Sequence, residues 1–110
     1  MGKLIEPKKR WIEVIDDEVD WNGLSVQQIG IVVDYWHAEK VQAVFDAADC
    51  VADIGDQDDQ GLCCVMYATI DPRCDYDTAK KYIIQAVLRK ISPRNWRTIL
   101  MDEFNFDPDF

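Results

Sequence analysis

The sequence predicts a helix-rich α+β domain with a small sheet. Apolar residues recur at helical spacing over the segments 24–53 and 79–104, whereas Leu62–Ile70 is a short, largely apolar run bounded by turn residues, which is typical of a buried strand. A chain of 110 residues is long enough for one domain and too short for two. We therefore expect a single globular domain over residues 1–101 and an acidic, aromatic tail over residues 102–110.

The first element is predicted to be a short strand over Lys9–Ile15, because this segment is rich in β-branched and aromatic residues. A helix is the alternative there, with Trp11, Ile15 and Val19 on one face. The dipeptide Asn22-Gly23 follows and is typical of a turn. The acids just before it are therefore expected to be solvated beside that turn.

A helix is predicted to start near Ser25, which forms a capping box with Gln28 three residues later, while Leu24 and Ile29 are placed for a hydrophobic staple. Its apolar residues stand at helical spacing: Val26, Ile29, Val33 and Trp36. Gly30 and the β-branched run after it argue against this helix, because both are poor helix formers. A second helix is predicted over His37–Asp53 from its apolar stripe, and it can continue the first without a break.

The second half of the chain is predicted to alternate loop, strand and helices. Gly55–Gly61 is expected to be a loop before the strand at 62–70. Asp75 or Asp77 is expected to cap the next helix, because a carboxylate accepts hydrogen bonds from the free backbone N–H groups there. Ser92-Pro93 is expected to start a last helix, with proline at its first position.

Charge is distributed unevenly along the chain. The protein has 21 Asp and Glu residues against 12 Lys and Arg residues, which gives a net charge of −9. Residues 11–59 hold thirteen acids and one base, Lys40, whereas residues 60–101 have a net charge of +4. An acidic surface argues against direct binding of nucleic acid, which needs basic side chains. It favours a partner protein with a basic surface.

No motif in the sequence indicates an enzyme, a metal site or a cofactor. The phosphate-binding, dinucleotide-binding, serine-hydrolase and zinc-protease motifs are absent. The single histidine, His37, and the cysteines lack the spacing of zinc ligands. Asp56–Gly61 begins like a calcium-binding loop, but Tyr67 stands where that loop needs a bidentate glutamate. We therefore expect a non-catalytic protein that needs no cofactor.

The sequence also lacks the patterns of a membrane span and of a signal peptide. Its longest apolar run, Leu62–Ile70, is far shorter than the roughly 18–20 residues that a span needs. No apolar stretch follows the basic residues near the N-terminus. We therefore expect a cytoplasmic protein with reduced, structural cysteines, namely Cys50, Cys63, Cys64 and Cys74.

Four tryptophans are many for a chain of this length. Trp11 and Trp36 stand among apolar residues and are expected in the core. Trp21 lies in an acidic turn and Trp96 in a basic one, where an exposed ring serves as a binding anchor. Core packing is the ordinary alternative for both.

The last ten residues, MDEFNFDPDF, form an acidic, aromatic motif. This stretch resembles the acidic, phenylalanine-terminated tip of bacterial single-stranded-DNA-binding proteins. The resemblance implies that Phe110 and its carboxylate dock into an apolar, basic-rimmed pocket of a genome-maintenance enzyme. Pro108 and the acids Asp102, Asp107 and Asp109 match the rest of that tip. The other residues do not resemble that family's β-barrel and long linker, so a tail packed on its own domain is the alternative.

Together these features predict an acidic inhibitor that mimics nucleic acid and binds the basic surface of a nucleic-acid-handling protein. Toxin-immunity proteins and phage anti-defence proteins both act in this way, because the Arg and Lys donors that bind phosphate also accept carboxylate. The alternative is an adaptor that recruits repair or replication enzymes through its tail, and a small enzyme comes third. The residues expected to bind the partner are Asp16, Asp17, Glu18, Asp20, Trp21, Asp46, Asp49, Asp53, Asp56, Asp58, Asp59, Asp107, Asp109 and Phe110.

Overall fold

In the computed structural model, which describes residues 12–108, strands β1 (Glu13–Trp21) and β2 (Leu24–Asp34) form a long antiparallel hairpin. Asn22 and Gly23 form its turn with φ angles of 53° and 83°. Two consecutive positive φ angles match the twist of the flanking strands and favour Asn-Gly. The predicted turn is therefore confirmed. The strand predicted over residues 9–15 agrees with β1 from Glu13 onward, and residues 9–11 lie outside the described part of the chain.

The helix predicted from Ser25 is wrong, because this segment is strand β2. β2 lies between β1 and β5 (Cys63–Ile70) and is hydrogen-bonded to both. Its β-branched run 31–33 favours an extended backbone. Pairing on both edges buries most of the strand, and this tertiary gain outweighs the local capping pattern.

Helix α1 (Ala38–Ala47) follows a short 3-10 turn, η1 (Tyr35–His37), and it ends six residues before the predicted helix does. Residues Val51–Ile54 form strand β3 instead, which pairs with β5. Asp58–Gln60 forms strand β4 inside the predicted loop, and it also pairs with β5. Only the last three residues of the predicted helix, 51–53, therefore join the sheet, because they pair with a strand that lies later in the sequence.

The helices after the sheet agree better with the prediction from the sequence. Helix α2 (Tyr76–Ile91) is capped as predicted by Asp75, whose carboxylate accepts hydrogen bonds from the Thr78 backbone N–H and hydroxyl at 3.0 and 2.9 Å. Helix α3 (Trp96–Phe104) starts three residues after Pro93, because residues 93–95 form a turn. Proline therefore precedes the last helix instead of opening it.

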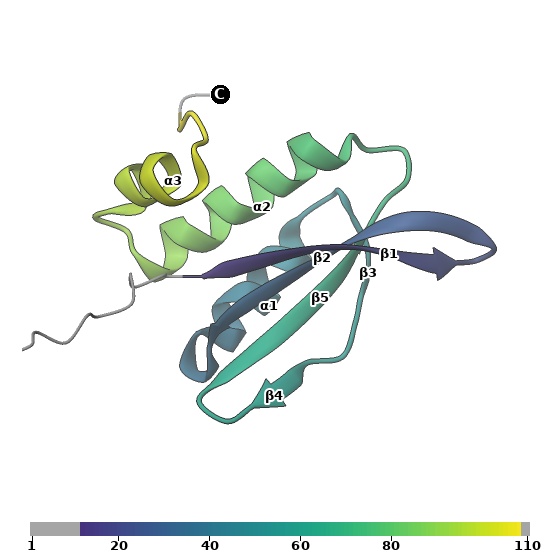
Figure 1. Cartoon of the computed structure of the whole chain (residues 1–110), viewed down its shortest axis with the longest axis horizontal. Coiled ribbons are helices and arrows are strands. Elements are labelled where there is room, and N and C mark those ends of the chain that lie inside the picture. The colour runs from purple at the N-terminus through teal and green to yellow at the C-terminus, as the bar shows by residue number, and fades with distance from the viewer. Residues whose placement is uncertain (1–11, 109–110) are drawn as a thin grey trace, which may run out of the picture.

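The sheet has the strand order β1-β2-β5-β3, with β4 on the same edge of β5 as β3. Figure 1 shows α2 running along this sheet and α3 packed beside α2. Of the described residues, 39% are helical and 36% lie in strands, which confirms the α+β class. The sheet is larger than predicted, because β2, β3 and β4 come from segments predicted as helix or loop. No helix within residues 12–108 is long and apolar enough to cross a membrane.

The helices cover one face of the sheet. Alternate residues of the two central strands join the helices in the main hydrophobic core: Ile29, Ile31, Val33, Cys64, Met66, Ala68 and Ile70. The residues between them, such as Val26, Val65 and Thr69, are outside this cluster, because side chains alternate between the two faces of a strand. We call the face that carries them the open face.

Candidate acidic interface

The five strands carry nine acidic residues and no lysine or arginine. All lysine and arginine residues between 12 and 108 lie outside the strands, on the helices and on loops next to them. The uneven charge of the sequence thus appears in the fold as a difference in charge between the layer of strands and the layer of helices. Every charged residue of the strands is acidic, and the basic groups lie in the helix layer and its loops.

The acids of β1 are divided between the two faces of the sheet. Asp16 stands opposite Ile29 in the register, and Asp17 stands opposite Gln28. Directly opposed residues of an antiparallel pair project to the same face. Since Ile29 belongs to the helix-facing core, Asp16 lies on the helix-covered face and Asp17 on the open face.

Asp16 is bound by helix α2. The Tyr76 hydroxyl donates a hydrogen bond to its carboxylate, and the Lys80 ammonium lies 3.0 Å from it. Burial alone would raise the pKa of Asp16, but the hydrogen bonds from Tyr76 and Lys80 and the Lys80 charge outweigh burial and lower it. Asp16 therefore ties β1 to α2, although the sequence placed it at the partner surface.

Three of the predicted acids do project from the open face. Asp17 does so from β1, while Asp53 pairs with Thr69 and Asp58 with Val65 on the opposite edge of the sheet. All three acids are exposed. The two edges are three strand spacings apart, about 14 Å. The open face therefore carries acids at both edges, and its two central strands are uncharged there except for Asp34 at the end of β2.

The remaining acids of β1 lie toward the turn of the hairpin. Glu18 and Asp20 are exposed, and alternation places them on the same side of the strand as Asp16. Trp21, the predicted binding anchor, is half-buried at the end of β1. Figure 1 shows the turn of this hairpin reaching beyond the helices.

The acids predicted between residues 46 and 59 do not form one surface with β1. Asp46 is exposed on α1, where it accepts a hydrogen bond from Gln42 at 3.2 Å. Asp49 follows the same helix and lines a pocket beside it. Asp56 lies in the exposed loop between β3 and β4, and Asp59 stands opposite Cys64 on the helix-covered side. The sequence alone could not show that these acids lie on different surfaces, because strand register decides which face each of them occupies.

The structure exposes Tyr35, Trp36 and Leu62, although Trp36 was expected in the core and Leu62 in a buried strand. Trp36 is 67% exposed, Tyr35 52% and Leu62 80%. The Tyr35 backbone N–H donates to the Leu62 carbonyl at 2.9 Å, which brings η1 against the β4–β5 turn. Exposed aromatic and apolar residues that lie near one another are typical of protein interfaces. Trp36 was missed because the helical pattern of segment 24–36 assigned it to a buried stripe.

This aromatic patch, Tyr35, Trp36 and Leu62, lies within the acidic layer. The exposed Asp34 at the end of β2 precedes it directly, and β4, with Asp58 and Asp59, leads into the same turn. An apolar centre with a charged rim is the usual anatomy of a protein–protein interface. The patch and its acids are therefore the candidate interface of this protein.

Trp96, the second predicted anchor, is half-buried beside two arginines. The guanidinium carbons of Arg89 and Arg97 lie 5.1 and 4.8 Å from the centre of its ring. Such cation–π contacts hold the ring against its own domain. Trp11 lies outside the described residues.

The chain after α3 packs on the domain as far as Phe106. Phe104 and Phe106 contact the core, their rings are stacked at 6.1 Å, and the Phe106 N–H donates to the Leu100 carbonyl at 3.1 Å. The Lys81 ammonium lies 5.5 Å from the centre of the Phe106 ring. Asp107 is exposed just beyond this contact, while Asp109 and Phe110 lie outside the described residues. The expected tail thus begins inside α3 and is docked over its first part.

Within residues 12–108, no group of three or more His, Cys, Asp or Glu side chains is arranged to hold a metal ion. No protein-family model matches the chain, and no curated protein or solved structure is significantly similar to it. Function is therefore inferred from the chemistry of the surface.

Proposed function

We propose that this protein is a non-catalytic acidic inhibitor that covers the basic nucleic-acid site of a nucleic-acid-handling protein. The observation that carries the proposal is that the strands hold nine acids and no base, and that Asp17, Asp53 and Asp58 project from the open face of the sheet. Arginine and lysine donors that bind phosphate also bind carboxylate, so an acidic sheet competes with nucleic acid for them. An anionic layer also speeds the encounter with a basic partner.

The aromatic patch supports binding that goes beyond charge. Trp36 and Tyr35 offer large rings with few rotatable bonds, and such residues supply much of the binding energy in known interfaces. The nearby acids Asp34 and Asp58 would form the rim, where charge mainly affects the rate of association. The partner surface should therefore pair basic residues with an apolar cleft.

The biological setting that fits is a cytoplasm in which a nuclease or defence enzyme must be neutralised. Both toxin immunity and phage anti-defence meet this description. The adaptor alternative depends on the C-terminal motif. It has less support, because Phe104 and Phe106 pack against the core instead of projecting to a partner.

The test compares two variants with the same change in net charge. Asp17, Asp53 and Asp58 are replaced by asparagine in the first, and the helix-side acids Asp46, Asp49 and Asp77 in the control. Each protein is used to capture its partner from source-cell extract, and the partner is identified by mass spectrometry. We expect the wild type and the control to retain a basic nucleic-acid-binding protein that the first variant loses.

The mechanism is then tested with the purified partner. Duplex DNA or RNA should displace the wild type, and binding should weaken toward about 0.5 M salt, where the screening length falls to about 4 Å. Association of the first variant should slow more than its dissociation accelerates. Simultaneous binding of nucleic acid and inhibitor, or equal loss in both variants, would refute the proposal.

A further inference from the structure

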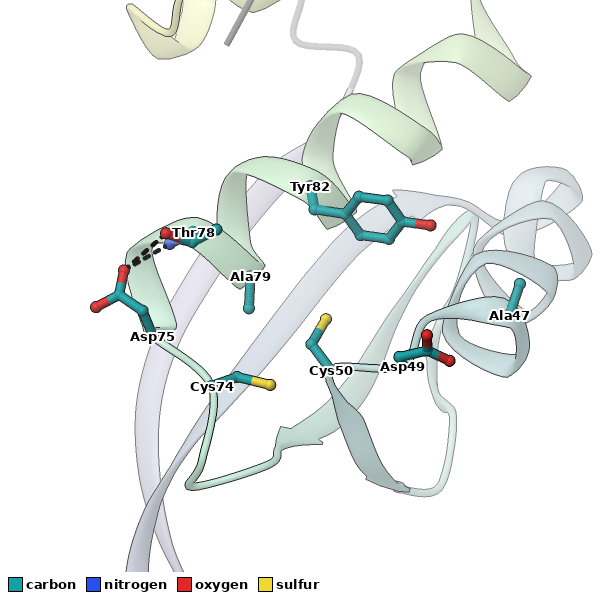
Figure 2. Close-up of a pocket in the computed structure, with 8 residues that line it drawn as sticks. All are labelled: Ala47, Asp49, Cys50, Cys74, Asp75, Thr78, Ala79 and Tyr82. Atoms are coloured by element: carbon teal, nitrogen blue, oxygen red, sulfur yellow. Dashed lines mark hydrogen bonds between the residues drawn. The ribbon is translucent and has the colours of Figure 1, made fainter.

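A pocket of about 470 Å³ opens between the end of α1 and the start of α2, away from the open face of the sheet. Its wall is largely apolar and includes Ala79 and the Tyr82 ring. Asp49 and Asp75 also line it, and Figure 2 shows the Asp75 carboxylate bound to Thr78 at the start of α2. The acidic interface uses none of these residues.

Two thiols from distant parts of the chain meet in this pocket. Figure 2 shows the sulfur atoms of Cys50 and Cys74 both directed into it. The backbone holds their segments together, because the Asp71 N–H donates to the Cys50 carbonyl at 2.8 Å and the Cys74 N–H donates to the Asp71 carbonyl at 2.9 Å. Both side chains are half-buried free thiols, within reach of small molecules.

The other two cysteines lack this arrangement. Cys63 and Cys64 are neighbours on β5, so their side chains project to opposite faces of the sheet. Cys64 is completely buried in the core. Only the pair in the pocket combines proximity in space with access from solvent among the described cysteines.

We propose that Cys50 and Cys74 are a redox-active pair that closes to a disulfide by exchange with a low-molecular-weight disulfide. In the first step the Cys74 thiolate attacks the small disulfide, forms a mixed disulfide and releases one small thiol. In the second step the Cys50 thiolate attacks the Cys74 sulfur and releases the other small thiol. Two protein thiols are thus oxidised while one small disulfide is reduced to two thiols.

The surroundings explain this order of attack. Burial, with a further contribution from Cys74, raises the pKa of Cys50, which lowers the thiolate fraction of Cys50 near neutral pH, and we therefore assign the first attack to Cys74. Asp49 and Asp75 place negative charge at the pocket. A cationic disulfide such as cystamine should therefore react faster than anionic oxidised glutathione.

Closure would link the segment before β3 to the segment before α2. A disulfide that closes the loop between residues 50 and 74 would restrict the unfolded chain. We therefore expect the melting temperature to rise by roughly 10 °C. In a reducing cytoplasm the pair would stay open, and it would close as the small-thiol pool becomes oxidised.

The wild-type protein itself is the test. It is incubated with cystamine or with oxidised glutathione and digested without reduction. We expect a peptide joined through Cys50 and Cys74, a fall from four free thiols to two, and the rise in melting temperature. Dithiothreitol should reverse all three changes.

Two variants distinguish disulfide formation between Cys50 and Cys74 from the general reactivity of exposed thiols. Cys63→Ser should behave as the wild type does. Cys50→Ser should stop at a stable mixed disulfide on Cys74, without the rise in melting temperature. A wild type that also stops at a mixed disulfide, or one whose disulfide includes Cys63, would overturn the proposal.

Discussion

Replacing Asp16 with asparagine should destabilise the fold, while the same change at Asp17 should not. The two residues are adjacent, and either substitution removes one negative charge. They differ in what they contact. Asp16 accepts from the Tyr76 hydroxyl and pairs with Lys80, whereas Asp17 accepts only a local hydrogen bond from the Glu18 N–H among the described contacts.

The size of the effect follows from these contacts. A hydrogen bond to a charged group contributes about 1.5–3 kcal/mol, and an exposed ion pair contributes about 0.2–1 kcal/mol. Because the Asp16 side chain is 52% exposed, solvent screens both interactions. We therefore expect Asp16→Asn to cost about 1–2 kcal/mol. Asp17→Asn should change stability by less than about 0.5 kcal/mol.

Urea denaturation and thermal melting measure this difference. In a domain of this size, Asp16→Asn should lower the melting temperature by about 4–10 °C. The pKa of Asp16 is lowered in the fold, so its contribution is present above the ordinary value of 3.8 and is lost as the pH falls through the folded-state value. Wild type and variant should therefore converge in acid.

Coupling between Asp16 and Lys80 provides the control. In a double-mutant cycle with Lys80→Met, the double variant should lose less unfolding free energy than the sum of the two single variants, by about 0.5–1 kcal/mol. Additive losses, or an equal effect of Asp17→Asn, would show that Asp16 is another solvated acid and would refute the assignment.

Three further outcomes are expected. Phe45→Ala should cost about 3–5 kcal/mol in urea denaturation because Phe45 is fully buried, whereas Leu62→Ala, on an exposed side chain, should leave stability nearly unchanged. Burial lowers the pKa of His37 below 6.5, so the unfolding free energy should fall as the pH drops from 6.5 to the lower folded-state pKa, and His37→Gln should remove this slope. Chelator should not change the melting temperature, since structural metal binding would add directly to the folding free energy; a clear decrease would reveal a metal.

The sequence predicted those elements whose stability is local. Asp75 caps α2 through its own neighbours, and the Asn22-Gly23 turn depends on backbone conformation alone. The strand at 62–70 was predicted from an apolar run that is too short for a helix. These features do not require knowledge of distant residues.

The errors arose where a distant partner decides the structure. Residues 24–34 satisfy a helix-capping pattern, yet they become a strand because β1 and β5 pair with both edges. Val51–Ile54 leaves the predicted helix for the same reason. The same errors affected the prediction of the candidate site. Strand register decides that Asp16 and Asp17 lie on opposite faces of the sheet, and Trp36 is exposed because β2 ends at Asp34.

The position of β1 at the margin of the sheet has a consequence for solubility. Among the described residues β1 pairs only with β2, so its outer backbone groups are available to the strands of other molecules. Long exposed edges of this kind are sites of aggregation, and charged side chains are a common protection against it. Five of the nine residues of β1 are acidic.

Two such edges cannot align without bringing rows of carboxylates together. This protection matters most before folding is complete. Gln28 of β2 pairs with Thr69 of β5, so the β5-facing edge of β2 stays unpaired until much of the chain has been synthesised. The acids of β1 would thus keep the nascent hairpin from associating with its own copies.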